Sequence, residues 1–172
     1  MPTTAVFSLP KEAAPKIKAL FDYWRSIHPA PAGGGGSLPR LLPGRQHLDP
    51  IDIPELLPNI WMIDVLREPE GGDIPRFRFR LIGTEIVKFT GRDATGKPLD
   101  AVYPDYPNTE AFRFHRAVAE NGEPGYRRSG VLSNPGRDFV EAERLYLPLA
   151  EDGRTVDIIL VMTLYQGDPP RR

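Results

Sequence analysis

The sequence contains no cysteine among its 172 residues. Composition therefore excludes disulfide bonds, thiolate zinc sites, iron–sulfur clusters and cysteine nucleophiles. Long apolar runs are also missing, since no stretch approaches the roughly 20 residues that span a bilayer. The first residues lack the basic segment and apolar run of a secretory signal. These absences predict a cytoplasmic protein that does not enter a membrane.

Neither sign of charge is in excess. The 22 Lys and Arg residues are balanced by 23 Asp and Glu residues, which gives a formal net charge of -1. Such a chain has no overall field that attracts nucleic acid or an anionic membrane, so we expect neither as a partner. Its three histidines, His28, His47 and His115, are too far apart for a two-histidine metal motif, and no metal site is predicted.

The N-terminal segment carries apolar residues at helical spacing from Lys11 to His28. This spacing predicts a helix with an aromatic stripe along one face. The stripe either covers the core of the domain itself or forms a dimer contact. The residues that would make this contact are Ile17, Leu20, Phe21 and Trp24.

A Pro- and Gly-rich stretch follows, and Gly33 to Ser37 has the composition of a flexible linker, either natural or engineered. We therefore expect a helix and linker at 1–37, a folded domain at 38–166 and a disordered tail at 167–172. One domain with an extension suits a chain of this length, which is long enough to bury a hydrophobic core.

The first strands are predicted over 59–66 and 74–81, joined by turn residues into a hairpin. In the second strand three arginines alternate with Phe77, Phe79 and Leu81, which indicates one wet and one buried face. The chain shows no basic excess, so a solvated face is favoured over a phosphate-binding stripe for Arg76, Arg78 and Arg80. Before this hairpin, 49–58 predicts one short helix capped by Asp52.

Short helical turns over 84–102 and a longer helix over 108–121, ending at Gly122, precede three more strands. These strands are predicted over 123–132, 139–149 and 154–166. Their order favours an antiparallel α+β sheet. The segment 158–162 is apolar on both alternating faces, so both faces of the sheet centre must be covered. Short helices would cover one face, and the N-terminal helix or a second subunit the other.

Few residues suggest catalysis. Glu141 and Glu143 share one strand face at a spacing that suits paired carboxylates. A salt bridge to Arg127 or Arg128 explains them more simply. His115 lies on the longer helix, where it serves either as a buried structural residue or as a haem ligand or pH sensor. We therefore expect no catalytic residues and a protein that is not an enzyme.

The segment GTEIVKFTGRDATGKPLDAVYP, at 83–104, resembles the helical segment of PAS domains, and the strand order agrees. Three segments, at 42–65, 77–86 and 143–153, are similar to a bacterial family of small PAS-like proteins of unknown function. The resemblance implies a five-stranded antiparallel sheet wrapped by short helices, with a small cavity under the longer helix. It also implies a cytoplasmic protein, often dimeric through a preceding helix. Neither haem nor flavin is implied, and no cofactor is assigned.

Three hypotheses about function follow. The leading one is a PAS-like sensory or regulatory domain that binds a small molecule in an apolar pocket, signals through dimerisation, or does both. The others are a ligand-free homodimeric interaction module and a small cavity enzyme that uses Glu141 or Asp64 as a base. The candidate pocket residues, chosen by size and strand or helix phase, are Trp61, Phe79, Phe89, Phe112, His115 and Leu145.

Overall fold

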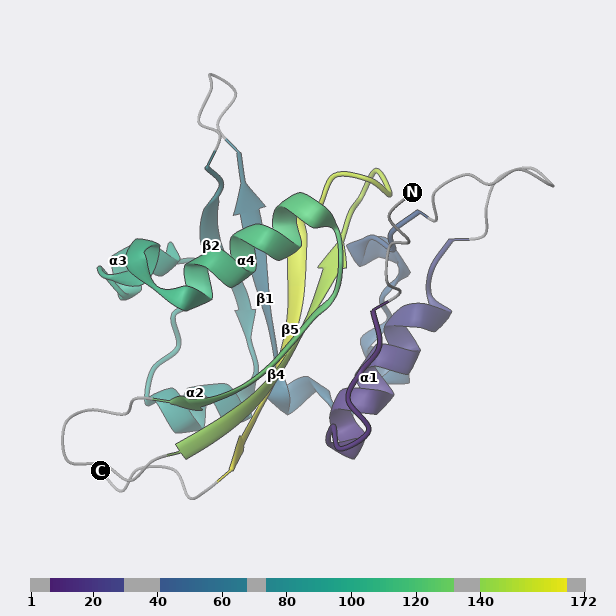
Figure 1. Ribbon diagram of the computed structural model, residues 1–172, viewed down its shortest axis with the longest axis horizontal. Helices are drawn as coiled ribbons and strands as arrows, with labels where there is room; N and C mark the ends of the chain where they lie inside the picture. The colour runs from purple at the N-terminus through teal and green to yellow at the C-terminus, as the bar shows by residue number, and fades with distance from the viewer. Residues whose placement is uncertain (1–6, 30–40, 68–73, 132–139, 167–172) are drawn as a thin grey trace.

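The chain folds around one five-stranded antiparallel sheet with strand order β2-β1-β5-β4-β3 (Figure 1). This computed structural model describes residues 7–29, 41–67, 74–131 and 140–166. The strands are β1 (Ile60–Leu66), β2 (Arg76–Ile82), β3 (Gly125–Val131), β4 (Val140–Leu149) and β5 (Ile158–Gln166). The helices are α1 (Pro15–Ser26), α2 (Thr84–Thr90), α3 (Leu99–Val102) and α4 (Glu110–Asn121). These elements confirm the predicted α+β class with a preceding helix.

Pairing between the first and last strands joins the two ends of the domain into a single layer. β1 pairs antiparallel with β2 on one side and with β5 on the other, where Trp61 lies opposite Val161. β4 pairs with β5 and with β3, which completes the sheet. The helices α2, α3 and α4 fill the connection between β2 and β3. Because this connection crosses one face, the other face is left to the N-terminal segment.

Helices cover opposite faces of the sheet, with α1 on one side and α2, α3 and α4 on the other (Figure 1). Two hydrophobic clusters result. The first lies under α1 and includes Ile17, Leu20, Leu145, Leu147 and Leu160. The second lies under the other helices and includes Ile63, Phe77, Tyr146, Ile159 and Val161. Neighbouring residues of β4 and β5 enter different clusters because strand side chains alternate between faces. We call these the α1 face and the helix-covered face.

Local sequence sets the ends of the two longer helices. The Thr109 side chain accepts a hydrogen bond from the Phe112 amide and so caps α4. Gly122 ends α4 in the left-handed conformation at φ 65°, which glycine adopts without steric cost. α1 begins at Pro15, where a proline ring fits the first helical turn. α1 is therefore shorter than the predicted helix over 11–28.

Among the described residues, no helix is long and apolar enough to cross a membrane.

Two local predictions are wrong. The segment 49–58 forms no single helix but contains the 3-10 turn η2 (Pro50–Asp52) and leads into η3 (Leu57–Asn59). The capping side chain is Asp49, which accepts from the Ile51 amide, and not Asp52. Pro54 lacks an N–H, which prevents a continuous hydrogen-bonded helix between the turns.

The second concerns Leu81, which is 46% exposed although alternation predicts it buried beside Phe79. The register shifts between Met62 and Ile63, so that Leu81 and Phe79 pair with consecutive residues of β1 and Arg80 is left over. An extra residue of this kind is a β-bulge, which breaks the side-chain alternation.

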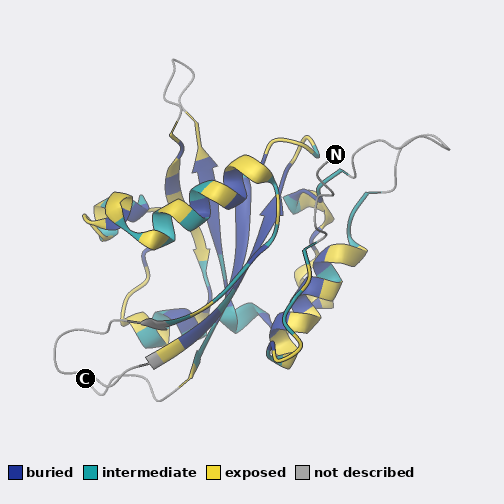
Figure 2. Cartoon of the chain, viewed as in Figure 1, coloured by how far each residue is buried: buried dark blue, intermediate teal, exposed yellow. Residues whose placement is uncertain are grey.

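α1 packs into the same hydrophobic cluster as the sheet and is therefore part of the same folded unit. The predicted boundary after residue 37 and the linker Gly33 to Ser37 lie outside the described residues, as does the predicted tail at 167–172. Burial of α1 toward the sheet and exposure of its outer side are visible in Figure 2.

Candidate functional site

An aromatic cluster surrounds His115 on the helix-covered face. α4 carries His115 inward, where the side chain is only 2% exposed. Four aromatic rings lie with their centroids 5.4 to 5.9 Å from the His115 ring, namely Trp61, Phe77, Tyr106 and Tyr146. The Tyr106 hydroxyl lies 2.6 Å from Nδ1 of His115 in a buried hydrogen bond. This bond fixes the orientation of the imidazole.

Burial controls the protonation of this pair. Burial, together with the positive charges of Arg144 and Arg127, lowers the pKa of His115 to about 3. The same burial raises the pKa of Tyr106, which keeps its hydroxyl protonated. His115 is therefore a neutral ring near pH 7. Its Nε2 is buried without a hydrogen-bond partner in the described part of the chain.

Four of the six predicted pocket residues meet in this region. Trp61, Phe79 and His115 are linked by ring contacts, with Trp61 5.8 Å from Phe79 and 5.9 Å from His115. Phe112 joins them through Phe77, at a centroid distance of 5.8 Å. These side chains form much of the packing between the sheet and α4.

The other two lie elsewhere. Phe89 of α2 stacks on Tyr165 at 3.6 Å, at the end of the helix-covered face where α2 lies. Leu145 is fully buried in the cluster under α1, so it cannot line the same surface as His115. This placement corrects the strand phase by one residue, since the neighbour Tyr146 faces His115 instead.

Residue size alone missed three aromatic neighbours of His115: Phe77, Tyr106 and Tyr146. Phe77 shares the alternation of Phe79 in β2, so its strand phase was a usable signal. Tyr146 gave no such signal because the neighbouring residues of β4 are buried on both faces of the sheet.

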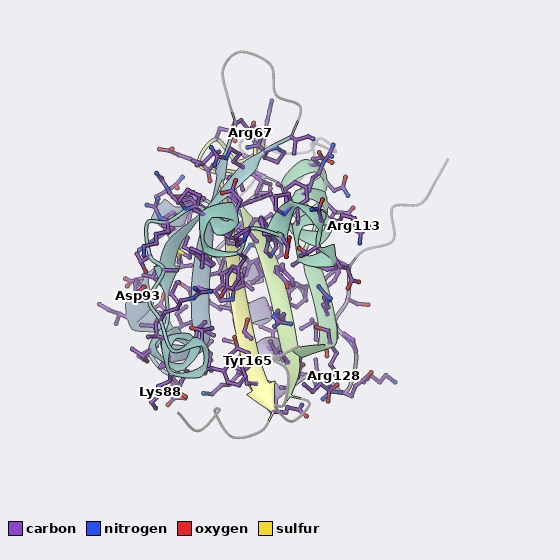
Figure 3. The ribbon with its side chains drawn as sticks, turned by 90° about the vertical axis from the view of Figure 1, so that its left-hand side faces the viewer. Arg67, Lys88, Asp93, Arg113, Arg128 and Tyr165 are labelled. Atoms are coloured by element: carbon purple, nitrogen blue, oxygen red, sulfur yellow. The ribbon has the colours of Figure 1, made fainter. Side chains whose placement is uncertain are left out.

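A polar group of side chains lies beside the aromatic cluster on the same face. Nη1 of Arg144 donates to Oγ of Ser129 at 3.1 Å, and Nε1 of Trp61 donates to Oγ1 of Thr163 at 2.9 Å. Burial raises the pKa of Tyr165 to about 12, and the Arg144 charge together with its hydrogen bond opposes this rise. Arg144 therefore lies close to Tyr165. Figure 3 labels Tyr165 on this side of the sheet. We call Trp61, Ser129, Arg144, Thr163 and Tyr165 the polar group.

On the opposite face, hydrogen bonds hold α1 against β4. Oε1 of Glu143, which is 2% exposed, accepts from the Ala14 amide at 2.9 Å and from the Tyr126 hydroxyl at 3.0 Å. Nε1 of Trp24 donates to the Pro148 carbonyl at 3.0 Å. Both ends of α1 are thus tied to the same strand.

The four residues considered for a dimer contact take part in this docking. Ile17 and Leu20 are fully buried, Phe21 is 8% exposed and Trp24 is 5% exposed. They contact the core of their own chain, which is the first of the two roles considered for the stripe. A dimer built from these side chains would require α1 to leave the sheet.

Carboxylates considered as catalytic bases are engaged in ion pairs. Asp64 lies 2.8 Å from Arg78 and 3.0 Å from Arg80, on the α1 face. Together with Arg45 these residues line two overlapping open hollows of about 420 and 550 Å³. Glu141 pairs with Arg128 at 3.3 Å, the cross-strand salt bridge expected from the sequence. Within the described ranges, no three His, Asp or Glu side chains gather as a metal site would require.

Comparison with known proteins identifies one family. A family model described as a PAS domain matches residues 13–163, from just before α1 into β5. The match therefore includes α1 together with the sheet. A search of curated proteins finds no match to the chain.

Proposed function

The chain belongs to the PAS domain family, and from this premise we propose a sensory or regulatory domain in which a bound small molecule changes the docking of α1. The molecule would lie on the helix-covered face, and α1 would be the output on the other. Membership in a family of sensory domains supports the regulatory role. A cytoplasmic location, expected from the sequence, belongs to the same proposal.

One observation carries this proposal: β4 contributes alternate side chains to both faces. Arg144 and Tyr146 face the helices α2 to α4, whereas Glu143 and Leu145 face α1. A shift of β4 that accommodates a ligand on one face must therefore move the acceptor for the α1 amide on the other. Packed interiors transmit such displacements because they contain little free volume.

α1 is suited to be a movable element. Its attachment combines a short apolar stripe with two hydrogen bonds to β4, a partly buried one from the Ala14 amide and a buried one from Trp24. An isolated helix of 12 residues is marginal in water, so α1 depends on this docking for its structure. Weakening the docking would both release and unfold the helix, so a partner protein could distinguish docked from released α1.

Native mass spectrometry of the protein purified from its own host tests this function. The proposal predicts a bound small molecule that is lost on mild unfolding and refolding. It also predicts that α1 amides exchange with deuterium at a different rate once the molecule is gone. Two results together would contradict ligand sensing: no small molecule bound to the purified protein, and a melting temperature that extracts of its host do not change.

A second candidate is a ligand-free interaction module that forms homodimers. The observation that favours it is the open hollow on the α1 face beside exposed Leu81, which leaves part of that face available to a partner. Sedimentation at micromolar concentration separates the two candidates. A stable dimer without bound ligand would support the second, and a monomer at all concentrations would rule it out.

A further inference from the structure

Two arginines lie directly opposite each other on the helix-covered face. Arg127 of β3 and Arg144 of β4 are Cα partners in the antiparallel ladder. Like charges at such positions destabilise a sheet unless each is neutralised. Arg127 is neutralised by Glu110 of α4, at 2.5 Å. Arg144 has no carboxylate within 4 Å in the described part of the chain, so this pair carries one surplus positive charge.

Arg144 is also partly removed from water. Its residue is half-buried, and its guanidinium donates to the neutral Ser129 hydroxyl at 3.1 Å. A guanidinium has five N–H donors in a planar fork that matches a carboxylate. Partial burial of a cation without a counter-ion costs free energy, and proteins seldom retain such a group without a use for it. Arg144 therefore has both unused donors and an unmatched charge.

The neighbours of Arg144 suit a ligand with an apolar body. Thr163 of β5 lies opposite Arg144, and its hydroxyl accepts a hydrogen bond from the Trp61 indole. Tyr165 lies close to Arg144 and stacks on Phe89 of α2. Trp61, Phe89 and Tyr165 are each partly exposed, so the core does not cover these aromatic residues completely.

We propose that Arg144 recognises the carboxylate of a small organic monoanion whose apolar part rests against Trp61 and Tyr165. A single negative charge matches the single surplus positive charge at the Arg127 and Arg144 pair. The inference rests on the proposed ligand-sensing function and adds the chemical class of the ligand. A carboxylate would bind the free edge of the guanidinium, the charge-assisted geometry that gives arginine its selectivity.

Paired probes test the charge requirement. Phenylacetate and phenylacetamide share an aromatic ring and differ in charge at the polar end. Binding of each to the full chain is measured by isothermal titration calorimetry. Loss of a charge-assisted hydrogen bond weakens binding at least about tenfold, so phenylacetate should bind at least about tenfold more tightly than the amide.

Arg144→Met keeps the apolar stem, removes the charge, and should abolish this preference. Arg128→Met is the matched control, because Arg128 pairs with Glu141 and lies outside the polar group. The control should keep the preference. Without ligand, the Arg144→Met variant should melt at or above the temperature of the unmodified chain, because an unmatched charge has been removed. A clearly lower melting temperature would indicate a structural role and overturn the inference.

Two further results would overturn it: equal binding of the acid and the amide, or undiminished binding of phenylacetate to Arg144→Met. Hydrogen exchange of α1 keeps this outcome apart from the fate of the proposed function. Carboxylate binding that depends on Arg144 but leaves α1 exchange unchanged would refute the output role of α1 and support the anion site. A neutral molecule bound to protein purified from the host would refute the anion site and support the proposed ligand sensing.

Discussion

Buried polar side chains on the two faces of the sheet have different surroundings. On the α1 face, Oε1 of Glu143 accepts from both the Ala14 amide and the Tyr126 hydroxyl. Among the described residues of the helix-covered face, His115 has a hydrogen-bond partner at Nδ1 only, and no carboxylate pairs with the half-buried Arg144. Polar groups that lack partners inside a protein cost stability, so they are found where a function needs them. At the residue scale, these groups support the proposed ligand site on the helix-covered face, whereas the bonds of Glu143 dock α1 on the other face.

Replacement of Glu143 by Ala should release α1. The change leaves the Ala14 amide and the Tyr126 hydroxyl without their acceptor, at a cost of about 2 kcal/mol in the free energy of unfolding. Urea denaturation measures the cost, and hydrogen exchange of α1 should accelerate. Glu141→Ala on the same strand face is the control, since Glu141 is exposed and should cost less than about 0.5 kcal/mol. Equal behaviour of the two variants would contradict the docking role of Glu143.

His115 should make the fold less stable in acid. Its pKa is about 3 in the folded chain against 6.5 for a free histidine, with burial as the main cause. Below pH 6.5 the unfolded chain therefore binds a proton that the folded chain does not, and the free energy of unfolding decreases as the pH falls toward 3. This loss in the free energy of unfolding is absent near pH 7 and reaches about 2 kcal/mol at pH 5.

His115→Gln provides the comparison because the amide retains hydrogen bonding toward Tyr106 and does not titrate. Urea denaturation at pH 7 and pH 5 should show a larger loss for the unmodified chain than for the variant. Identical losses in the two proteins would show that His115 is solvated rather than buried.

At the scale of elements, α1 and the sheet are one packed unit. The apolar stripe of α1 is buried against β4 and β5, and its N-terminal residues reach a buried side chain of β4. A helix of this length gains most of its stability from such packing rather than from its own propensity. Any motion of α1 is therefore coupled to the strand that it contacts.

Leu20→Ala tests whether the stripe is core or dimer contact. Leu20 is fully buried, so truncation should lower the free energy of unfolding by about 2 to 5 kcal/mol. This loss should not depend on protein concentration, because the contacts lie within one chain. Asp22→Ala on the exposed side of α1 should leave stability nearly unchanged. A variant that folds normally but dissociates from a dimer would instead place the stripe in an interface.

Sequence patterns predicted the elements better than the faces on which their residues lie. The two hairpin strands, the longer helix ending at Gly122 and the three late strands are all present, because turn residues and periodicity mark them directly. The side chains of β4 and β5 could not be assigned to a face, since both faces are apolar and alternation carries no phase. Leu145 was therefore placed beside His115, where Tyr146 lies. The bulge at Arg80 left no mark in the sequence.

The polar group escaped prediction for a related reason. Arg144, Ser129 and Tyr165 come from three strands, and only the register of those strands brings them together. Register depends on contacts between distant segments, which single-sequence periodicity does not report. The family resemblance predicted the sheet and its helices correctly, but it did not indicate which side chains lie on the helix-covered face.

At the scale of the whole molecule, the sheet separates two surfaces and joins them through shared strands. The helix-covered face holds the aromatic cluster around His115 and the polar group. The other face holds α1 (Figure 1). β1, β4 and β5 contribute side chains to both clusters. In the proposed function, a ligand binds one arrangement of these strands more tightly and shifts the population of docked α1 by its difference in affinity for the two states.

Hydrogen exchange of α1 in protein purified from its host, before and after bound molecules are removed, tests this coupling most directly. The α1 amides at 16–26 should exchange at different rates in the two samples, while the amides of β5 remain protected in both. Rates in α1 that stay identical, although a bound molecule has been lost, would contradict the account.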